Sequence, residues 1–510
     1  MKPYLLLLCL LIYRYPFAQT YFNTAVPTSE YYVETIYCPA YINSSDKILT
    51  LALSKFRNKY GYLNKIIELD KGGKLVRINE YLDSINSQTV FALKKTNYGY
   101  ISSGYKFRSS DTINHFWFAK LDNNLDTIWT KNVKKKYNNS SFNNIIELKN
   151  KSIALCGTDM LVRRSGTFLS TIPVLAIADS LGNINKYVEI RGTDTTGGEG
   201  FYGISEGFDH SIYASGYIVK LDNLLDQDPI IAKVDSSGNL LWRKQIINKG
   251  FNEIFKSTLT QKDGSILGIG ASYNDYGASK EFSYVLLINF DSDGNINWTK
   301  RIFKGLINDF SNAIQDYNGN IIGAGLYNRY RGLYADTSAG HGWIFKCSAT
   351  GDSIWSRSIV HASEPFPERF NNISQADDGG FYLTGYTFVP DDYSSKAWIV
   401  KTDSFGCVVP GCQNIVSTED IKSGKEKAFV MFPNPVSERF FFLSRITNDE
   451  PLQMLMDNLK GELVQTYKFR AYEGHQYQVD LKEDIPSGLY NVTIVNAKGM
   501  VLFSEKLEKV

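Results

Sequence analysis

The residues best placed to do chemistry fall in two short motifs of this 510-residue chain. Gly203-Ile-Ser205-Glu-Gly207 matches the G-x-S-x-G pattern, in which a sharp strand-to-helix turn exposes a nucleophilic serine. Asp291-Ser-Asp293-Gly-Asn295-Ile-Asn297 places oxygen-bearing side chains at alternate positions, as the first half of a calcium-binding loop does. Acyl transfer by a serine and calcium binding are therefore the first chemistries to weigh.

The serine motif fits a strand better than a catalytic turn. A recurring phenylalanine marks equivalent positions along the chain, and Ser205, four residues after it, has these counterparts: Ile146, Leu259, Ile314 and Ser374. Those counterparts lie inside β runs, whereas a nucleophile elbow needs a strand-to-helix turn. We therefore assign no catalytic residue.

The metal motif and the histidines give no better support. Ile296 stands where a calcium loop needs glycine, and the twelfth position of the motif is not Glu. No H-E-x-x-H or C-x-x-C pattern occurs, and the five histidines are scattered: His115, His210, His341, His361 and His475. The sequence predicts no metal and no cofactor.

The elements that would position a site come from a repeat. Its clearest copy is the turn Asp235-Ser-Ser-Gly238-Asn-Leu-Leu-Trp242, where an Asp that bonds its own downstream backbone and a glycine at positive φ join two β runs. The counterparts of Asp235 recur at steps of 52 to 57 residues: Asp70, Asp122, Asp179, Asp291, Cys347 and Asp403. A tryptophan at one fixed strand position suggests a wedge between neighbouring sheets, and it recurs as Trp129, Trp242, Trp298 and Trp355.

A second anchor completes the repeat. Five phenylalanines each stand fifteen residues before a glycine, in the pairs Phe142 and Gly157, Phe201 and Gly216, Phe255 and Gly270, Phe310 and Gly325, and Phe370 and Gly385. Two more strands fit between these marks, so each repeat is four short antiparallel strands, as in a propeller blade. The sequence predicts an all-β chain with a seven-bladed β-propeller over residues 20–412. Repeat seven lacks its fourth strand, which Thr20 to Asn23 could supply.

Composition and the chain start indicate an exported globular protein. The chain is 43% hydrophobic with a net charge of +2, which supports a packed core and gives no electrostatic case for nucleic acid. Lys2, the apolar run 4–13 and Ala18 predict a signal peptide over residues 1–18. The apolar run is too short to span a membrane, and no later stretch is long enough.

A second domain follows a polar segment. Residues 413–427 are rich in Lys, Glu, Ser and Thr and predict a linker. Residues 428–510 contain seven short runs of alternating apolar and polar residues separated by turn residues. This pattern predicts a small Ig-like β-sandwich.

Four motifs in that domain resemble a known family. They are Phe429-Val-Met-Phe-Pro433-Asn434-Pro435-Val-Ser-Glu-Arg-Phe, Leu459-Lys-Gly461-Glu-Leu, Ile485-Pro-Ser487-Gly488-Leu489-Tyr490, and a closing Lys506-Leu507. In this order they are similar to the type A carboxy-terminal sorting domain of the Bacteroidetes type IX secretion system. The resemblance implies recognition by that machinery, passage through the periplasm and outer membrane, and either release or attachment at the cell surface. The upstream repeats also look like propeller repeats found in front of such domains.

Two functions of different classes remain open. The first is a secreted or surface-attached propeller that binds glycan or protein, and the second is an extracellular enzyme acting on polysaccharide or another polymer. We favour binding, because no pair of catalytic carboxylates can be located in the sequence. The expected contacts lie in the loops between second and third strands, where Tyr and Arg can stack on sugars or grip carboxylates: Arg163, Arg164, Tyr273, Tyr276, Arg329, Tyr330, Arg331, Tyr334, Asp391, Asp392 and Tyr393.

The five cysteines after the predicted signal peptide divide into two groups. Cys407 and Cys412 lie either side of Pro410-Gly411, a turn that brings them together, so we expect a disulfide in an exported protein. Cys38, Cys156 and Cys347 fall in or beside predicted strands and are expected to be buried as small hydrophobic residues.

Overall fold

The computed structural model shows two compact units, residues 1–412 and 413–510. It describes residues 21–510 except 27–30, 44, 57–61, 82–87, 109–112, 134–139, 163–167, 193–195, 221–226, 249–251, 274–282, 303–306, 329–339, 362–367, 390–393, 409–427, 459–462, 473–474, 483 and 497–500. In these ranges every regular element is a β-strand. None of the described residues forms a helix long and apolar enough to cross a membrane.

Five sheets of the first unit contain four consecutive strands each. The first is β7 (Gln88–Thr96), β8 (Gly99–Arg108), β9 (Ile113–Leu121) and β10 (Thr127–Val133). The second is β11 (Ser141–Glu147), β12 (Ile153–Val162), β13 (Phe168–Ala178) and β14 (Ile184–Glu189). The third is β15 (Thr196–Glu206), β16 (Ile212–Lys220), β17 (Gln227–Val234) and β18 (Leu240–Gln245). The fourth is β19 (Asn252–Thr260), β20 (Ile266–Tyr273), β21 (Val285–Phe290) and β22 (Ile296–Ile302). The fifth is β23 (Ile307–Gln315), β24 (Ile321–Asn328), β25 (Gly340–Cys347) and β26 (Ser353–Ile359).

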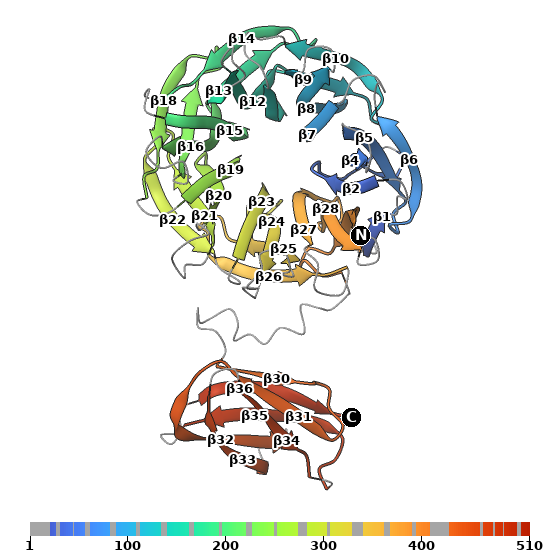
Figure 1. The fold of residues 1–510 in the computed structure, drawn as a ribbon, viewed down its shortest axis with the longest axis vertical. Coiled ribbons are helices and arrows are strands. Elements are labelled where there is room, and N and C mark those ends of the chain that lie inside the picture. The colour runs from blue at the N-terminus through green and yellow to red at the C-terminus, as the bar shows by residue number, and fades with distance from the viewer. Residues whose placement is uncertain are drawn as a thin grey trace, which may run out of the picture. The chain divides into compact units, whose positions relative to one another are not determined.

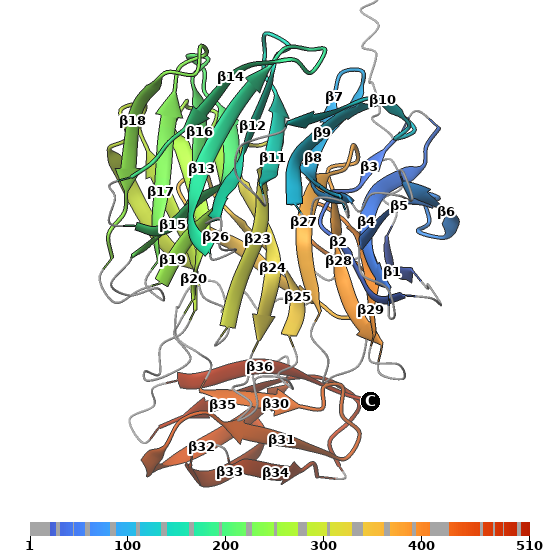
Figure 2. The ribbon, with the colours of Figure 1, turned by 45° about the horizontal axis from the view of Figure 1, so that its top comes forward.

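The sheets stand in a ring around a central axis (Figure 1). The first strand of each sheet, such as β7, β15, β19 and β23, lies nearest the centre, and the last strand, such as β10, β14, β18 and β22, lies outside. Successive strands of one sheet lie side by side, as β23, β24 and β25 do in Figure 2. This arrangement is a propeller fold.

A nine-stranded sheet joins the two ends of the ring. It contains β27 (Arg369–Gln375), β28 (Phe381–Val389), β29 (Ser394–Thr402), β1 (Phe22–Val26), β2 (Tyr31–Ile36), β3 (Tyr41–Ile42), β4 (Ile48–Phe56), β5 (Tyr62–Leu69) and β6 (Leu75–Tyr81). β1 pairs antiparallel with β29 from Phe22 opposite Lys401 to Val26 opposite Ala397. The strand expected at residues 20–23 therefore lies slightly further along the chain. β2 and β29 meet only at the parallel pair of Val33 and Ser395.

The Asp turns adopt the expected conformation. The Oδ1 atom of Asp235 accepts hydrogen bonds from the backbone N–H groups of Ser237 and Asn239, at 2.9 and 2.8 Å, and Gly238 has φ +81°. One assignment was wrong by a residue. Ser348, and not Cys347, fills the Asp position, because its Oγ accepts from the N–H groups two and four residues later at 3.3 and 3.1 Å. A serine hydroxyl performs the same role as the carboxylate, and the turn lies one residue further along the chain than the regular spacing predicts.

The recurring tryptophans are wedges between sheets, as expected. A β-carbon added to the turn glycine of one sheet would lie 2.7–3.1 Å from the indole ring on the last strand of the sheet before it. This contact joins Trp129 to Gly182, Trp242 to Gly294, Trp298 to Gly351 and Trp355 to Gly406. Where the propeller closes, the aromatic side chain of Phe22 takes the place of the indole and covers Gly73.

The phenylalanine and glycine anchors are direct cross-strand partners. Phe255 lies opposite Gly270, and the register of β19 shifts immediately after it in a β-bulge. The bulge brings the carbonyl oxygen of Ile254 to 1.8 Å from where a β-carbon on Gly270 would stand. The same pairing and bulge recur at Phe142, Phe201, Phe310 and Phe370. Glycine is required here because the backbone itself occupies the space of a side chain.

The second unit consists of two facing sheets. One contains β30 (Phe429–Phe432), β31 (Arg439–Ser444) and β34 (Gln476–Asp480), and the other contains β32 (Asn448–Asn458), β33 (Leu463–Ala471), β35 (Gly488–Val495) and β36 (Val501–Lys509). The seven expected strands are all present. Aromatic side chains from both sheets share one core, including Phe429, Phe442, Phe469 and Phe503.

We predict that Gly270→Ala lowers the stability of the ring by about 2–3 kcal/mol, because the new methyl group forces the β19 bulge to open. Gly72→Ala is the matched control, since its β-carbon would meet only the Asp70 carboxylate at 3.4 Å. Thermal unfolding of both variants measures the difference. Equal melting temperatures for the two variants would contradict the bulge constraint.

We also predict that Phe22→Ala lowers the free energy of unfolding by about 3 kcal/mol or more. Phe22 is 8% exposed, and its aromatic side chain packs on Gly73 where the propeller closes. Phe405→Ala is the control, since Phe405 is 47% exposed in a turn. Chemical denaturation of both variants provides the comparison. A Phe22→Ala protein as stable as Phe405→Ala would show that β1 does not hold the ring closed.

Candidate functional site

The first strands of the sheets enclose a polar pocket on the ring axis. Its volume is about 670 Å³, and it lies where these strands run into their first hairpin turns. It is lined by Lys94, Lys95, Thr96, Asn97, Asn144, Ile146, Glu147, Ile204, Ser205, Glu206, Ser257, Thr258, Leu259, Thr260, Asn312 and Ala313. We call this the axial pocket. Hydroxyl, amide and charged side chains dominate its lining, which suits a polar ligand.

Hydrogen bonds between sheets fix much of this lining. Asn144 donates to the backbone oxygen of Tyr202 at 3.0 Å, and the hydroxyl of Ser257 donates to the side-chain oxygen of Asn312 at 3.1 Å. Asn312 in turn donates to the side chain of Asn372 at 2.8 Å. Because each side chain is held by the next sheet, the lining is preorganised before any ligand arrives.

Lys94 is the exception in this lining. Its side chain is partly exposed to the axial pocket. Burial lowers the pKa of the Lys94 ammonium, and the nearby thiols of Cys38 and Cys156 oppose that shift. Burial raises the pKa of both thiols, so they are neutral neighbours rather than counter-charges. Within the described residues, no carboxylate forms an ion pair with Lys94.

Two carboxylates also line the pocket, but other groups already hold them. Glu206 accepts a hydrogen bond from the backbone N–H of Lys149 at 2.8 Å and contacts Nδ1 of His210 at 3.0 Å. Glu147 forms an ion pair with Lys151 at 3.5 Å. Both carboxylates therefore stabilise the turns around the pocket.

Exposed aromatic and lysine side chains alternate on the hairpin turns at this end of the ring. Tyr98, Phe208 and Tyr317 are 76%, 58% and 63% exposed, and they lie on turns of alternate sheets. The turns between them carry the exposed Lys149 and Lys262. Lys149 Nζ lies 5.0 Å from the centre of the Phe208 ring, and Lys262 donates to the Tyr317 backbone oxygen at 2.5 Å. We call these five residues the rim.

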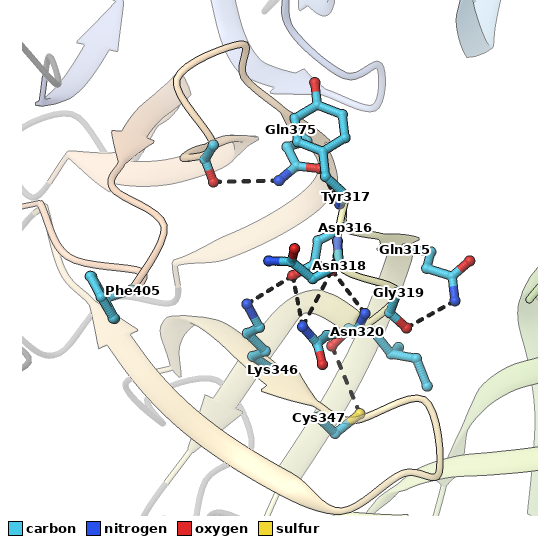
Figure 3. A network of polar contacts seen from close by, with 12 residues as sticks. Gln315, Asp316, Tyr317, Asn318, Gly319, Asn320, Lys346, Cys347, Gln375 and Phe405 are labelled. Carbon is cyan, nitrogen blue, oxygen red and sulfur yellow. Dashed lines mark hydrogen bonds and ion pairs between the residues drawn. The ribbon is translucent and has the colours of Figure 1, made fainter. Parts of the chain in front are cut away.

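A buried polar network holds the turn that carries Tyr317 (Figure 3). The Asp316 carboxylate pairs with Lys346 at 2.8 Å and accepts from the backbone N–H groups of Asn318 and Asn320 at 2.9 and 2.8 Å. The backbone N–H of Tyr317 donates to the side chain of Gln375 on the next sheet at 3.1 Å. These contacts fix the backbone of the turn that carries the exposed side chain of Tyr317.

The structure agrees with the strand interpretation of the serine motif. Ser205 lies inside β15, opposite Tyr213, and its hydroxyl accepts from Thr260 at 3.1 Å. The Asp291 motif forms a turn of the ring, because both carboxylate oxygens of Asp291 accept hydrogen bonds from Asn295. No cluster of three or more His, Cys, Asp or Glu side chains within the described ranges is arranged to hold a metal ion.

A second polar group lies further along the inner strands. Asp309 pairs with Lys256 at 2.9 Å and with Arg369 at 2.5 Å, so one carboxylate joins cations from two neighbouring sheets. On β15 and β16, the rings of Tyr202 and Tyr217 stack with centroids 5.5 Å apart. These residues follow or flank the phenylalanine anchors and precede the pocket-lining residues along each strand.

The loop residues predicted to bind ligand are not tested by this structure. Tyr273 ends β20 but its side chain is outside the described residues, and so are the following residues entirely: Arg163, Arg164, Tyr276, Arg329, Tyr330, Arg331, Tyr334, Asp391, Asp392 and Tyr393. Cys407 forms a disulfide, but Cys412 also lies outside the described residues, so their pairing stays a prediction. Cys38, Cys156 and Cys347 are free and buried, as expected.

Sequence reasoning missed the axial pocket, although a signal for it exists. Lys94 occupies the same repeat position as Ile146, Ser205 and Leu259, which are apolar or small. A lysine at a position that packing fills elsewhere with Ile, Leu or Ser marks a departure from the repeat. The departure lies within a strand, whereas the ligand contacts were expected in loops.

The motif residues of the second unit hold its last strand. The Asn434 side chain donates to the backbone oxygen of Lys506 at 2.6 Å and accepts from the N–H of Glu508 at 2.9 Å. The peptide bonds before Pro433 and Pro435 are cis. Tyr490 donates to the backbone oxygen of Pro486 at 2.6 Å, while Gly461 lies outside the described residues.

Comparisons with solved structures give distant likenesses. A protein of unknown function from Dyadobacter fermentans is 11% identical with a TM-score of 0.42, covering 74% of this chain and 97% of that one. The β-propeller domain of the Trilobed protease from Pyrococcus furiosus is 12% identical with a TM-score of 0.38, covering 76% and 99%. The polysaccharide lyase Uly1 is 11% identical with a TM-score of 0.43, covering 76% and 92%. No curated protein matches the chain.

The second unit has a clear family match. The model of the secretion system C-terminal sorting domain matches residues 430–507, which include the Asn434 and Tyr490 contacts. Such a tail directs export to the cell surface or the medium. The carboxy-terminal part of this chain belongs to the type IX secretion sorting domain family.

Proposed function

We propose that the protein is a secreted or cell-surface binding module, in which a seven-bladed propeller holds a glycan or protein ligand and an Ig-like sandwich directs export. The observation that carries the binding role is the axial pocket, a preformed polar cavity of about 670 Å³ on the ring axis. Preformed concave cavities of roughly 300–1,000 Å³ are the usual form of small-ligand sites.

The count of seven follows if the nine-stranded sheet comprises two blades. One would contain β2, β4, β5 and β6, and the other β27, β28, β29 and β1, because β2 and β29 share only the pair of Val33 and Ser395. Together with the five four-stranded sheets this gives seven blades. In this arrangement β1 closes the ring by supplying the outer strand of the last blade.

An extracellular enzyme acting on a polymer is the second candidate. One observation favours it: Glu147 and Glu206 line the same pocket, and two carboxylates are what glycoside hydrolysis uses. Binding is the better supported function, because both Glu206 oxygens already hold His210 and the Lys149 backbone. A carboxylate engaged in this way is poorly placed to exchange a proton with a substrate.

Two sets of variants distinguish the axial pocket from the loops at the opposite end of the strands. Asn97→Trp places a large ring at the pocket mouth, whereas Tyr330→Ala with Arg331→Ala removes loop side chains. We expect ligands that are identified on glycan and protein arrays to bind the Asn97→Trp variant at least about tenfold more weakly than the wild type. Loss only in the loop variant would place the site among the loops, and unchanged affinity in both would remove the binding proposal.

We predict that truncation after Gln413 blocks export without unfolding the ring, because the ring has its own closed core. In the native host the truncated protein should accumulate in the periplasm and keep its melting temperature. Fractionation and thermal unfolding provide the two measurements. Truncated protein in the medium, or a clearly lower melting temperature, would contradict the division of roles between the two units.

A further inference from the structure

The axial pocket contains one cation that the fold does not need. Lys94 stands where β11, β15 and β19 carry Ile146, Ser205 and Leu259. Partly burying an ammonium group is unfavourable unless an anion or a set of acceptors compensates it. Within the described residues neither a hydrogen bond nor an ion pair to Lys94 supplies that compensation. An anionic group from outside the chain would supply this compensation.

The remaining lining is suited to a polyhydroxylated molecule. Hydroxyl groups of Ser205, Thr258 and Thr260 and amides of Asn144 and Asn312 surround the pocket. Their positions are fixed by contacts between sheets, as the hydrogen bond from Thr260 to Ser205 illustrates. Each of these groups already makes one hydrogen bond between sheets, and it keeps further donor or acceptor capacity that can meet the hydroxyls of a sugar.

The rim extends the site outward. Tyr98, Phe208 and Tyr317 present exposed aromatic faces, which stack on the apolar faces of sugar rings. Lys149 and Lys262 stand between them and add positive charge. The acids on the same turns are held locally, since Asp209 pairs with Lys233 at 2.8 Å and Asp263 accepts from the backbone N–H of Ser265 at 2.9 Å.

The shape of the site argues against a folded protein as its occupant. A stable protein interface buries about 800 Å² on each partner over a broad surface. The axial pocket is instead a cavity among inner strands, surrounded by a ring of turns. It accommodates a few sugar units of an extended chain better than a globular surface.

Resting on the proposed function, we propose that the axial pocket binds an acidic oligosaccharide, with one sugar carboxylate on Lys94 and neighbouring sugar rings on the rim aromatics. The carboxylate forms a charge-assisted hydrogen bond with the ammonium group in a site partly shielded from water. A neutral sugar of the same backbone forgoes this bond and leaves the Lys94 charge without a partner. The pocket therefore selects for charge as well as for shape.

The test uses the full chain and calorimetric titration with oligogalacturonate and with the same oligosaccharide after reduction of its carboxyl groups. We expect the wild type to bind the acidic form at least about tenfold more tightly. Lys94→Met, which keeps the aliphatic stem, should abolish that preference. Lys300→Met is the matched control and should retain it, because Lys300 lies on β22, outside the pocket lining, and pairs with Asp352 at 3.0 Å.

A surface variant keeps the test decisive if Lys94→Met does not fold. Tyr98→Ala with Tyr317→Ala alters only exposed rings and should weaken acidic oligosaccharide binding about tenfold or more. The inference is overturned if wild type binds both oligosaccharides equally or binds neither, if Lys94→Met keeps the preference, or if Lys300→Met loses it equally. If the wild type binds neither oligosaccharide but binds another ligand that Asn97→Trp does not bind, this inference is refuted and the proposed function stands.

Discussion

The ring depends on a close approach between two backbones in each sheet. Where Phe370 lies opposite Gly385, the carbonyl oxygen of Arg369 stands 1.9 Å from the site of a missing β-carbon. At the equivalent bulge after Phe142, two consecutive side chains, Asn143 and Asn144, donate to the backbone oxygens of Phe201 and Tyr202 on the next sheet at 2.8 and 3.0 Å. The glycine permits the bulge, and the bulge directs polar side chains of one sheet to the backbone of the next. These side chains form part of the polar lining of the axis.

The outside of the ring uses apolar contacts for the same purpose. Trp298 covers Gly351 of the next sheet, and Phe22 covers Gly73 where the chain ends meet. Asn23 strengthens the closure, because its side chain accepts from the Trp398 indole at 2.6 Å and donates to the Val360 backbone oxygen at 2.9 Å. The sorting unit has a separate core, and its Asn434 contacts serve only its own last strand.

Local chemistry explains which features could be predicted from the sequence. The Asp turns and the phenylalanine and glycine anchors are visible because each needs a particular residue at a particular backbone position. Ser348 was missed because its hydroxyl replaces a carboxylate without changing the turn. The axial pocket was missed for a different reason: Lys94, Ser257 and Asn312 come from different sheets and converge only in the closed ring. The motif residues Asn434 and Tyr490 could be identified by resemblance, but their contacts with Lys506 and Pro486 required the structure.

If the ligand binds on the ring axis at the rim end, hydrogen–deuterium exchange with and without oligogalacturonate will detect it. We expect slower exchange in the turns at residues 96–99, 148–151 and 207–210, which surround the axial pocket. Protection confined to residues 329–339 and 390–393, with the rim turns unchanged, would contradict it.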